Sequence, residues 1–127
     1  MSKPRVAIVG ASADRAKYGN KSVRAHQKSG YEVYPIHPTL AEVEGLAAYR
    51  SVSDVPGGRL DRVSMYVPPT VGMTLIAEIA AKGCDEFWLN PGSQSPELIE
   101  KARAAGLEPI VSCSIVELGV SPGDFGP

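Results

Sequence analysis

The same order of residues occurs three times in this chain: a helical stretch, a glycine and then a short apolar run. Gly30, Gly83 and Gly106 each precede such a run, at 31–36, 84–89 and 107–111. A glycine after a helix is typical of a left-handed C-terminal cap, so each copy predicts a helix followed by a strand. Strands that alternate with helices are joined by right-handed crossovers, which build a parallel sheet. The pattern therefore predicts a three-layer α/β fold.

Further apolar runs complete this prediction. Strands are expected at 5–9 and 62–67, with a minor one near 47–49, so the open parallel sheet has about five strands and carries helices on both faces. Helices are expected at about 20–29, from a cap at Thr70 to about residue 80, and after Ser95-Pro96. The first of these has the weakest pattern, because His26 occupies an inward position where an aliphatic side chain is expected.

Length and composition limit the classes of function. The 127 residues predict one domain, at 1–118, followed by a flexible tail at 119–127 that is rich in glycine and is expected to fray or to lie along the surface. A net charge of −1 argues against general affinity for nucleic acid or for an anionic membrane surface. The chain has neither a membrane-spanning run nor a signal peptide, so a cytoplasmic location is expected. Cys84 and Cys113 lack the spacing of metal ligands and are expected to be separate thiols.

The first predicted strand runs directly into Gly10-Ala11-Ser12, where α/β folds hold phosphate groups. The dinucleotide fingerprint is incomplete, since the next glycine, Gly19, follows only after a basic and aromatic insertion at 14–18. Arg15, Lys17, Lys21 and Arg24 concentrate positive charge beside this turn. They are interpreted as neutralising phosphate, and the alternative is a solvated helix face.

The ends of the other predicted strands carry small, rigid or amide-bearing residues. No carboxylate lies among them, so the sequence does not indicate general acid–base catalysis. An NAD site needs an acidic residue after the second strand, but this strand ends at Ile36-His37-Pro38, and Glu42 and Glu44 come later. This argues against NAD and, less strongly, against NADP.

With these residues in view, the chain resembles the small single-domain CoA-binding proteins, which are related to the N-terminal CoA-binding domain of the succinyl-CoA synthetase alpha subunit. The resemblance covers about 3–117 and rests on five motifs: Val9–Ser12, Gly30–Pro38, Tyr66–Pro69, Trp88–Gly92 and Ala104–Leu107. It implies a Rossmann-like domain that binds coenzyme A, or an acyl-CoA, through its 3′-phosphorylated ADP portion. It also implies that the domain is not an enzyme, with a regulatory or carrier role.

The resemblance also implies roles for individual residues. The phosphates would meet Gly10, Ala11 and Ser12, and the loop would be closed by Lys17, Tyr18, Gly19 and Asn20. The nucleotide would lie by His37 and Pro38, against Val67, Pro68 and Pro69. The channel for the pantetheine arm would be edged by Asn90, Pro91 and Gly92.

Several alternatives stay open. His37 either contacts the nucleotide or only ends its strand, and Cys113 either forms a mixed disulfide with the CoA thiol or packs in the interior. The whole domain could instead be an NAD(P)-binding oxidoreductase domain, or an interaction module that binds no ligand. Hydrophobic helix faces make a homodimer conceivable.

Overall fold

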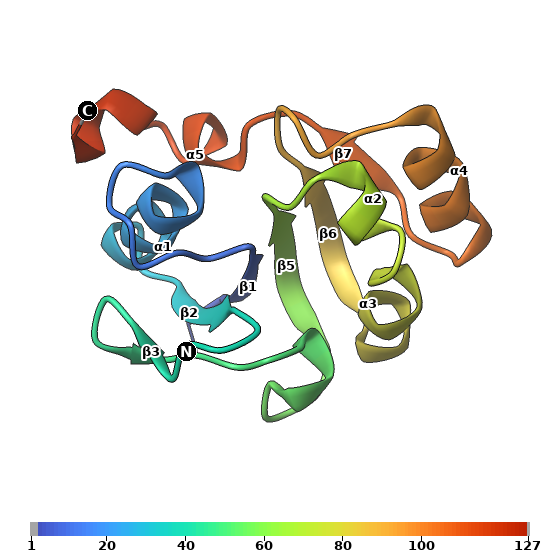
Figure 1. The fold of residues 1–127 in the computed structure, drawn as a ribbon, viewed down its shortest axis with the longest axis horizontal. Helices are drawn as coiled ribbons and strands as arrows, with labels where there is room; N and C mark the ends of the chain where they lie inside the picture. Colours follow the sequence, from blue (N-terminus) through green and yellow to red (C-terminus); the bar gives the residue numbers. More distant parts are fainter. Residues whose placement is uncertain (1–2, 127) are drawn as a thin grey trace.

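The computed structural model describes residues 3–126, in which a five-stranded parallel sheet lies between two layers of helices (Figure 1). The strands follow the order β2-β1-β5-β6-β7 across the sheet. Their bounds are β1 Arg5–Val9, β2 Glu32–Ile36, β5 Leu60–Met65, β6 Cys84–Leu89 and β7 Pro109–Val111. All four strand pairs are parallel. This confirms the predicted three-layer, Rossmann-like α/β fold.

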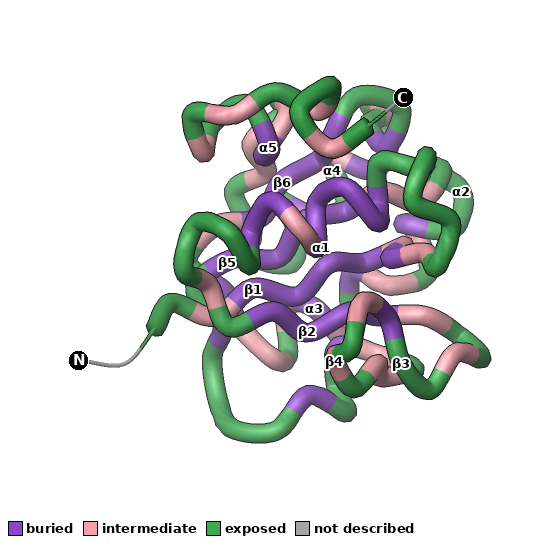
Figure 2. Tube along the Cα trace, turned by 90° about the vertical axis from the view of Figure 1, so that its left-hand side faces the viewer, coloured by how far each residue is buried: buried purple, intermediate pink, exposed green. Residues whose placement is uncertain are grey.

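Alternate residues of β1 pack into different cores, one on each face of the sheet. Val6 and Ile8 belong to a cluster with Val23 of α1 (Tyr18–Lys28). Ala7 and Val9 belong to a larger cluster that includes residues of α3 (Ile76–Lys82) and α4 (Pro96–Ala104). Both faces of β1 are therefore buried from Val6 to Val9, which explains why these four residues are all apolar (Figure 2).

The helices agree with the sequence analysis at α1, expected at about 20–29, and at α4, and depart from it between these two helices. Ser95 caps α4 as predicted, since its side chain accepts a hydrogen bond from the backbone N–H of Leu98 at 3.1 Å. The single helix expected from Thr70 is instead two: α2 (Pro69–Gly72) and α3. The cap at Thr70 is wrong, because Pro68 is the N-cap residue of α2 and Thr70 lies inside the helix.

The minor strand predicted near 47–49 is only partly correct. Two short strands, β3 (Glu42–Val43) and β4 (Leu46–Ala47), form an antiparallel hairpin outside the main sheet. Beyond the hairpin, the backbone N–H of Tyr49 donates to Pro35 at 2.9 Å, and Tyr49 accepts from the N–H of His37 at 2.9 Å. These bonds hold residue 49 beside the carboxyl end of β2. A 3₁₀ turn, η1 (Val52–Asp54), follows.

The C-terminal segment lies along α1 (Figure 1). After α5 (Ser114–Glu117), a second 3₁₀ turn, η2 (Pro122–Phe125), is capped by the Ser121 side chain. The Lys21 ammonium donates to the Gly126 carbonyl at 2.9 Å, and the Phe125 ring lies under Arg24 and Lys28. Over 119–126 the segment therefore lies on the surface, one of the two arrangements expected for it. The division of the chain at residue 118 stays a prediction.

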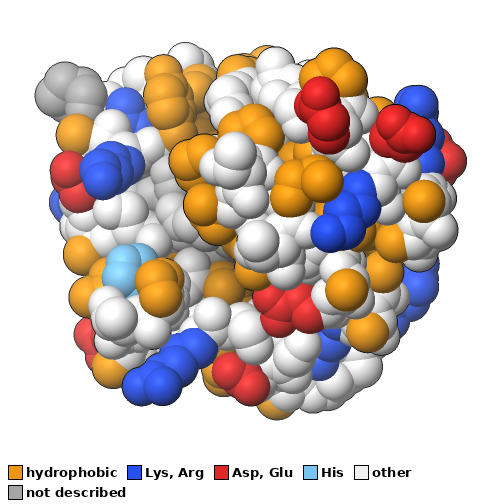
Figure 3. All heavy atoms as spheres, turned by 45° about the vertical axis from the view of Figure 1, so that its right-hand side comes forward, with side chains coloured by type: hydrophobic (Ala, Val, Ile, Leu, Met, Phe, Trp, Pro, Cys, Tyr) orange, Lys and Arg blue, Asp and Glu red, His pale blue; other side chains and the backbone are white. Residues whose placement is uncertain are grey.

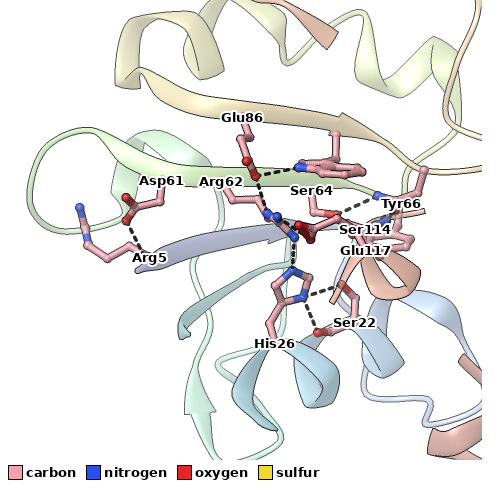
Figure 4. Close-up of polar contacts among 12 residues, drawn as sticks. Arg5, Ser22, His26, Asp61, Arg62, Ser64, Tyr66, Glu86, Ser114 and Glu117 are labelled. Atoms are coloured by element: carbon pink, nitrogen blue, oxygen red, sulfur yellow. Dashed lines mark hydrogen bonds and ion pairs between the residues drawn. The ribbon is translucent and has the colours of Figure 1, made fainter. Parts of the chain in front are cut away.

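A buried arginine lies between the sheet and α1, and we call it and its partners the Arg62 cluster: Arg62, His26, Tyr31, Glu86, Trp88 and Glu117. Figure 4 shows the Arg62 side chain among those of His26, Glu86 and Glu117. Arg62, in β5, is 2% exposed, and its guanidinium donates to Glu86 and to Glu117 at 2.8 Å each. The same group lies 4.8 Å from the Trp88 ring centroid and 5.3 Å from that of Tyr31. Burial opposes its charge, but the bond to Glu117 and the charge of Glu86 outweigh burial and raise the pKa of Arg62.

His26 belongs to this cluster as a neutral ring. Its Nδ1 lies 2.8 Å from the Ser22 carbonyl, which can only accept a hydrogen bond, so Nδ1 carries the proton. Its Nε2 faces a guanidinium nitrogen of Arg62 at 3.4 Å. Burial lowers the pKa of His26 to about 4, and the nearby positive charge of Arg62 adds to this effect. The inward position that lacks an aliphatic side chain is thus occupied by a histidine that is fully buried and hydrogen-bonded.

Candidate functional site

A cleft opens at the carboxyl ends of β1 and β5, the neighbouring strands at the centre of the sheet. The chain leaves β1 toward α1 on one face and leaves β5 toward α2 on the other, so this edge is the topological switch point where α/β folds bind ligands. The cleft has a volume of about 420 Å³. It is lined by Gly10, Ala11, Ser12, Lys17, Tyr18, Gly19, His37, Pro38, Tyr66, Val67, Pro68 and Pro91. The structure thus brings most of the predicted site residues together.

Two glycines set the shape of the cleft floor. Gly10 has a φ of +91°, and a Cβ there would lie 3.1 Å from Val67 Cγ1. A Cβ on Gly19 would lie 2.1 Å from the Gly10 carbonyl oxygen, closer than any side chain can approach. The start of α1 therefore touches the turn after β1. This contact explains why Gly19 is needed although it stands far from Gly10 in the sequence.

The loop between these glycines is held by its own hydrogen bonds. The Ser12 hydroxyl accepts from the N–H of Asp14 at 3.0 Å, and the Asp14 carboxylate accepts from the N–H of Ala16 at 3.0 Å. The buried Asn20 amide donates to the Ser12 carbonyl at 2.8 Å and to Glu44 at 3.1 Å. Glu44, at the tip of the β3–β4 hairpin, thus supports the loop from outside. The sequence analysis missed this role and treated Glu44 only as too late for an NAD site.

Of the four cations near the loop, only Lys17 lines the cleft. Lys21 is bonded to the C-terminal segment, Arg24 donates to Asn20 and to the Arg15 carbonyl, and Arg15 lies 3.5 Å from the Glu44 carboxylate. Lys17 is therefore the one of the four that the structure places at the cleft, and the expectation that all four neutralise phosphate stays a prediction. Lys17 is the N-cap residue of α1, and no acidic residue lies in the first turn of this helix. A positive side chain and the positive end of a helix dipole thus face the same cleft.

His37 has a defined role in the second wall of the cleft. Its Nδ1 accepts from the backbone N–H groups of Thr39 at 3.0 Å and of Leu40 at 2.9 Å. An acceptor at Nδ1 means that the proton of the neutral ring is on Nε2. The histidine therefore orders the turn after β2, and its other nitrogen is not used by these bonds. Its contact with a nucleotide stays a prediction.

Four predicted residues do not line the cleft: Asn20, Pro69, Asn90 and Gly92. Asn20 acts from beneath the loop, and Pro69 begins α2. The Asn90 side chain is 1% exposed, with its amide bonded to Ser64 and to the Met65 carbonyl and its oxygen accepting from Ser114. All its polar atoms are used within the fold, which argues against the predicted contact with a pantetheine arm.

Tyr66 is a cleft residue that the sequence analysis did not select. It follows β5, and its hydroxyl lies 3.0 Å from Ser114 Oγ, which lies 2.7 Å from Ser64 Oγ (Figure 4). Burial raises the pKa of Tyr66, so the phenol is neutral. The sequence could have indicated Tyr66 as a cleft residue, because it lies at the end of a strand at the centre of the sheet. This row of hydroxyls connects the cleft to α5.

Other parts of the described structure bear on function classes. Among residues 3–126 there is no group of three or more His, Cys, Asp or Glu side chains placed to hold a metal ion. Within the same residues, no helix is long and apolar enough to cross a membrane. Acidic and basic side chains are interspersed with hydrophobic ones on the face drawn in Figure 3.

Known proteins resemble this chain in sequence. The alpha subunit of ADP-forming acetate–CoA ligase II of Pyrococcus furiosus is 35% identical over 81 residues, which are 61% of this chain and 17% of that subunit. The protein YneT of Bacillus subtilis is 25% identical over 111 residues, 87% of this chain and 82% of YneT. This chain therefore spans a small part of the ligase subunit and most of YneT.

Solved structures share the fold. A conserved hypothetical protein of Pyrococcus furiosus is 38% identical with a TM-score of 0.81, over 90% of this chain and 98% of that chain. The dinucleotide-forming acetyl-coenzyme A synthetase 1 of Ca. Korarchaeum cryptofilum is 29% identical with a TM-score of 0.73, over 85% of this chain and 26% of the synthetase. The family of the CoA binding domain matches residues 4–119. The chain belongs to this CoA-binding domain family.

Proposed function

We propose that the cleft binds coenzyme A or an acyl-CoA through its phosphorylated ADP portion, and that the protein acts as a CoA binder, in a regulatory or carrier role, rather than as an enzyme. The observation that carries this proposal is the joining of Lys17, the start of α1 and the Gly10 turn in one cleft. Backbone N–H groups and a cation that face one hollow suit a phosphorylated ligand. The relatives named as CoA ligases and as a CoA synthetase support the choice of ligand.

The side chains of the cleft support a role in binding without catalysis. Among the residues that line it there is no carboxylate, and His37 uses Nδ1 to order its own turn. General acid–base catalysis needs a proton donor or acceptor that is positioned beside the reacting atom. A fixed pair of such groups is missing among the residues that line the cleft. The cytoplasmic location, the absence of affinity for nucleic acid and the possible homodimer stay predictions.

A thermal-shift comparison of four ligands tests the proposal. The purified protein is heated with CoA, acetyl-CoA, NAD or NADP in parallel. A ligand present at 100 times its Kd stabilises the folded state by about 2.7 kcal/mol, which is readily measured as a rise in Tm. We expect a rise with CoA or acetyl-CoA. A rise with NAD alone would contradict the proposal, and no rise with any ligand would favour the interaction module.

Lys17→Glu should weaken CoA binding about tenfold or more, because it replaces a cation at the phosphates with an anion. The measurement is isothermal titration calorimetry with CoA. Lys3→Glu is the matched control: Lys3 is exposed and precedes β1 at the opposite end of the sheet. Equal effects of the two variants would mean that Lys17 acts only through net charge.

A further inference from the structure

A second, apolar pocket adjoins the cleft and shares three lining residues with it, Gly10, Pro38 and Val67. It lies on the other side of the Gly10 turn, between the carboxyl end of β2 and the segment from η1 to α3. Its remaining lining residues are Val9, Ile36, Arg50, Val52, Val71, Leu75 and Glu78. The volume is about 220 Å³. Pockets for whole drug-sized ligands measure roughly 300–1,000 Å³, so this one suits a single flat ring system.

Two charged residues, Glu78 and Arg50, line this apolar pocket, and they differ in whether their side chains form hydrogen bonds. The Glu78 carboxylate accepts a hydrogen bond from the Ser53 hydroxyl at 3.2 Å. For Arg50, no hydrogen bond or ion pair of the side chain is found within the described part of the chain. Its backbone is nevertheless fixed, because the preceding residue, Tyr49, is hydrogen-bonded on both sides to the end of β2. Arg50 is thus a basic residue with a fixed backbone at the pocket, and its side chain has no hydrogen-bond or ion-pair partner within the described residues.

Most other arginine side chains form hydrogen bonds or ion pairs. Arg5, Arg24, Arg59 and Arg62 donate to carbonyl, amide or carboxylate oxygens, and Arg15 pairs with Glu44. Lys17 and Arg50 are therefore the two cations of the connected hollows that lack such partners over residues 3–126. One stands at the phosphate turn, and the other stands beside the apolar pocket.

We propose that Arg50 binds the 3′-phosphate of CoA and thereby selects CoA over nucleotides that lack this group. The inference rests on the proposed function and deepens it. CoA carries two separate anionic groups, a pyrophosphate and a ribose 3′-phosphate, and its adenine is attached to the same ribose. With the pyrophosphate at Lys17 and the adenine in the apolar pocket, the ribose 3′-phosphate comes to Arg50. A guanidinium binds a phosphate through two parallel hydrogen bonds, which suits this task.

Glu78 fits the same arrangement. Its carboxylate can accept a hydrogen bond from an exocyclic amine such as that of adenine, but it would repel a phosphate placed beside it. A phosphate is therefore favoured beside Arg50 and disfavoured beside Glu78. Removal of the Arg50 charge would leave a phosphate facing Glu78 alone, which sharpens the expected loss of affinity.

The test compares CoA with dephospho-CoA, which has a hydroxyl in place of the 3′-phosphate, by isothermal titration calorimetry. The wild-type protein should bind CoA about tenfold to a hundredfold more tightly than dephospho-CoA. Arg50→Gln should remove this preference, weakening CoA binding and leaving the Kd for dephospho-CoA within about twofold. Arg103→Gln, at an exposed position on α4, is the matched control and should change neither affinity.

The possible outcomes separate this inference from the proposed function. Equal wild-type affinity for the two ligands, or an equal loss for both in Arg50→Gln, would overturn the role of Arg50 and leave CoA binding intact. Binding of neither ligand by the wild-type protein would overturn the proposed function and this inference together. Arg50 is exposed, and a Tm equal to that of the wild type shows that the Arg50→Gln variant is folded.

Discussion

The Arg62 cluster and the cleft both contain positively charged side chains, but these side chains have partners within the fold in the cluster and, among the residues that the structure describes, lack them in the cleft. In the cluster, Arg62 contacts two carboxylates and two aromatic rings, and His26 is bonded at both nitrogens. In the cleft and its adjoining pocket, Lys17 and Arg50 have no such partner among the described residues. The difference suggests that charge satisfied inside the fold stabilises the protein, whereas charge left unsatisfied at its surface is available to a ligand. Variants should therefore separate stability from binding.

Arg62→Ala should give the largest loss of stability, about 3–5 kcal/mol in the free energy of unfolding. The change leaves a cavity between Tyr31 and Trp88 and removes the partner of His26 Nε2. Urea denaturation followed by tryptophan fluorescence measures the effect. The affinity for CoA of the remaining folded protein should not change, because Arg62 does not line the cleft.

Arg59→Ala is the control for this variant. Arg59 also forms an ion pair, in which its Nε lies 2.7 Å from Asp85 Oδ1. The Arg59 and Asp85 side chains are 62% and 60% exposed. Exposed pairs contribute little to stability, because water screens the two charges, so the loss for Arg59→Ala should be much smaller than for Arg62→Ala. Similar losses for Arg59→Ala and Arg62→Ala would show that burial of the Arg62 cluster adds nothing to stability.

The second prediction concerns pH. The unfolded chain gives His26 its usual pKa of 6.5, while the fold lowers it to about 4. Between these values the unfolded state binds more protons, so the stability present above pH 6.5 should fall as the pH drops toward 4, by about 3 kcal/mol in total. Urea denaturation at a series of pH values measures this loss. His26→Gln, which cannot titrate, should show a smaller dependence in this range, and an unchanged dependence would contradict the assignment.

The smallest effect on stability, and the largest on the shape of the cleft, is expected for Gly19→Ala. The added Cβ would meet the Gly10 carbonyl, so α1 and the turn must move apart. We expect a loss of about 1–3 kcal/mol in stability together with a clear loss of CoA affinity. Gly58→Ala is the control, since a Cβ there meets nothing within 4 Å. A Gly19→Ala protein that binds CoA normally would show that the loop can adapt.

The sequence predicted the sheet because each strand has a local signal. The glycine caps at Gly30, Gly83 and Gly106 mark where strands begin, and the apolar run of β1 reports burial on both faces. The break between α2 and α3 has no comparable signal. The apolar spacing from Val71 to Ala80 continues across it, so periodicity alone predicted one helix.

The sequence predicted the site residues whose place in the cleft follows from their position along the backbone. It did not predict those whose role depends on the direction of the side chain. Gly10, Lys17 and Pro38 line the cleft because they follow the ends of strands or begin a helix. Asn90 also follows a strand, but its side chain turns into the fold, where it is bonded to Ser64, Ser114 and the Met65 carbonyl. Arg62 was not singled out, because its partners come from segments far apart in the sequence.

The hydrogen bonds within the loop from Ser12 to Asn20 have a thermodynamic consequence. They fix the loop through groups of the chain itself, with Glu44 as an outer support. The conformational entropy of the loop is therefore lost when the chain folds, and little is left to lose when a ligand binds. Contacts at the cleft can then contribute to affinity with only a small cost for ordering the loop.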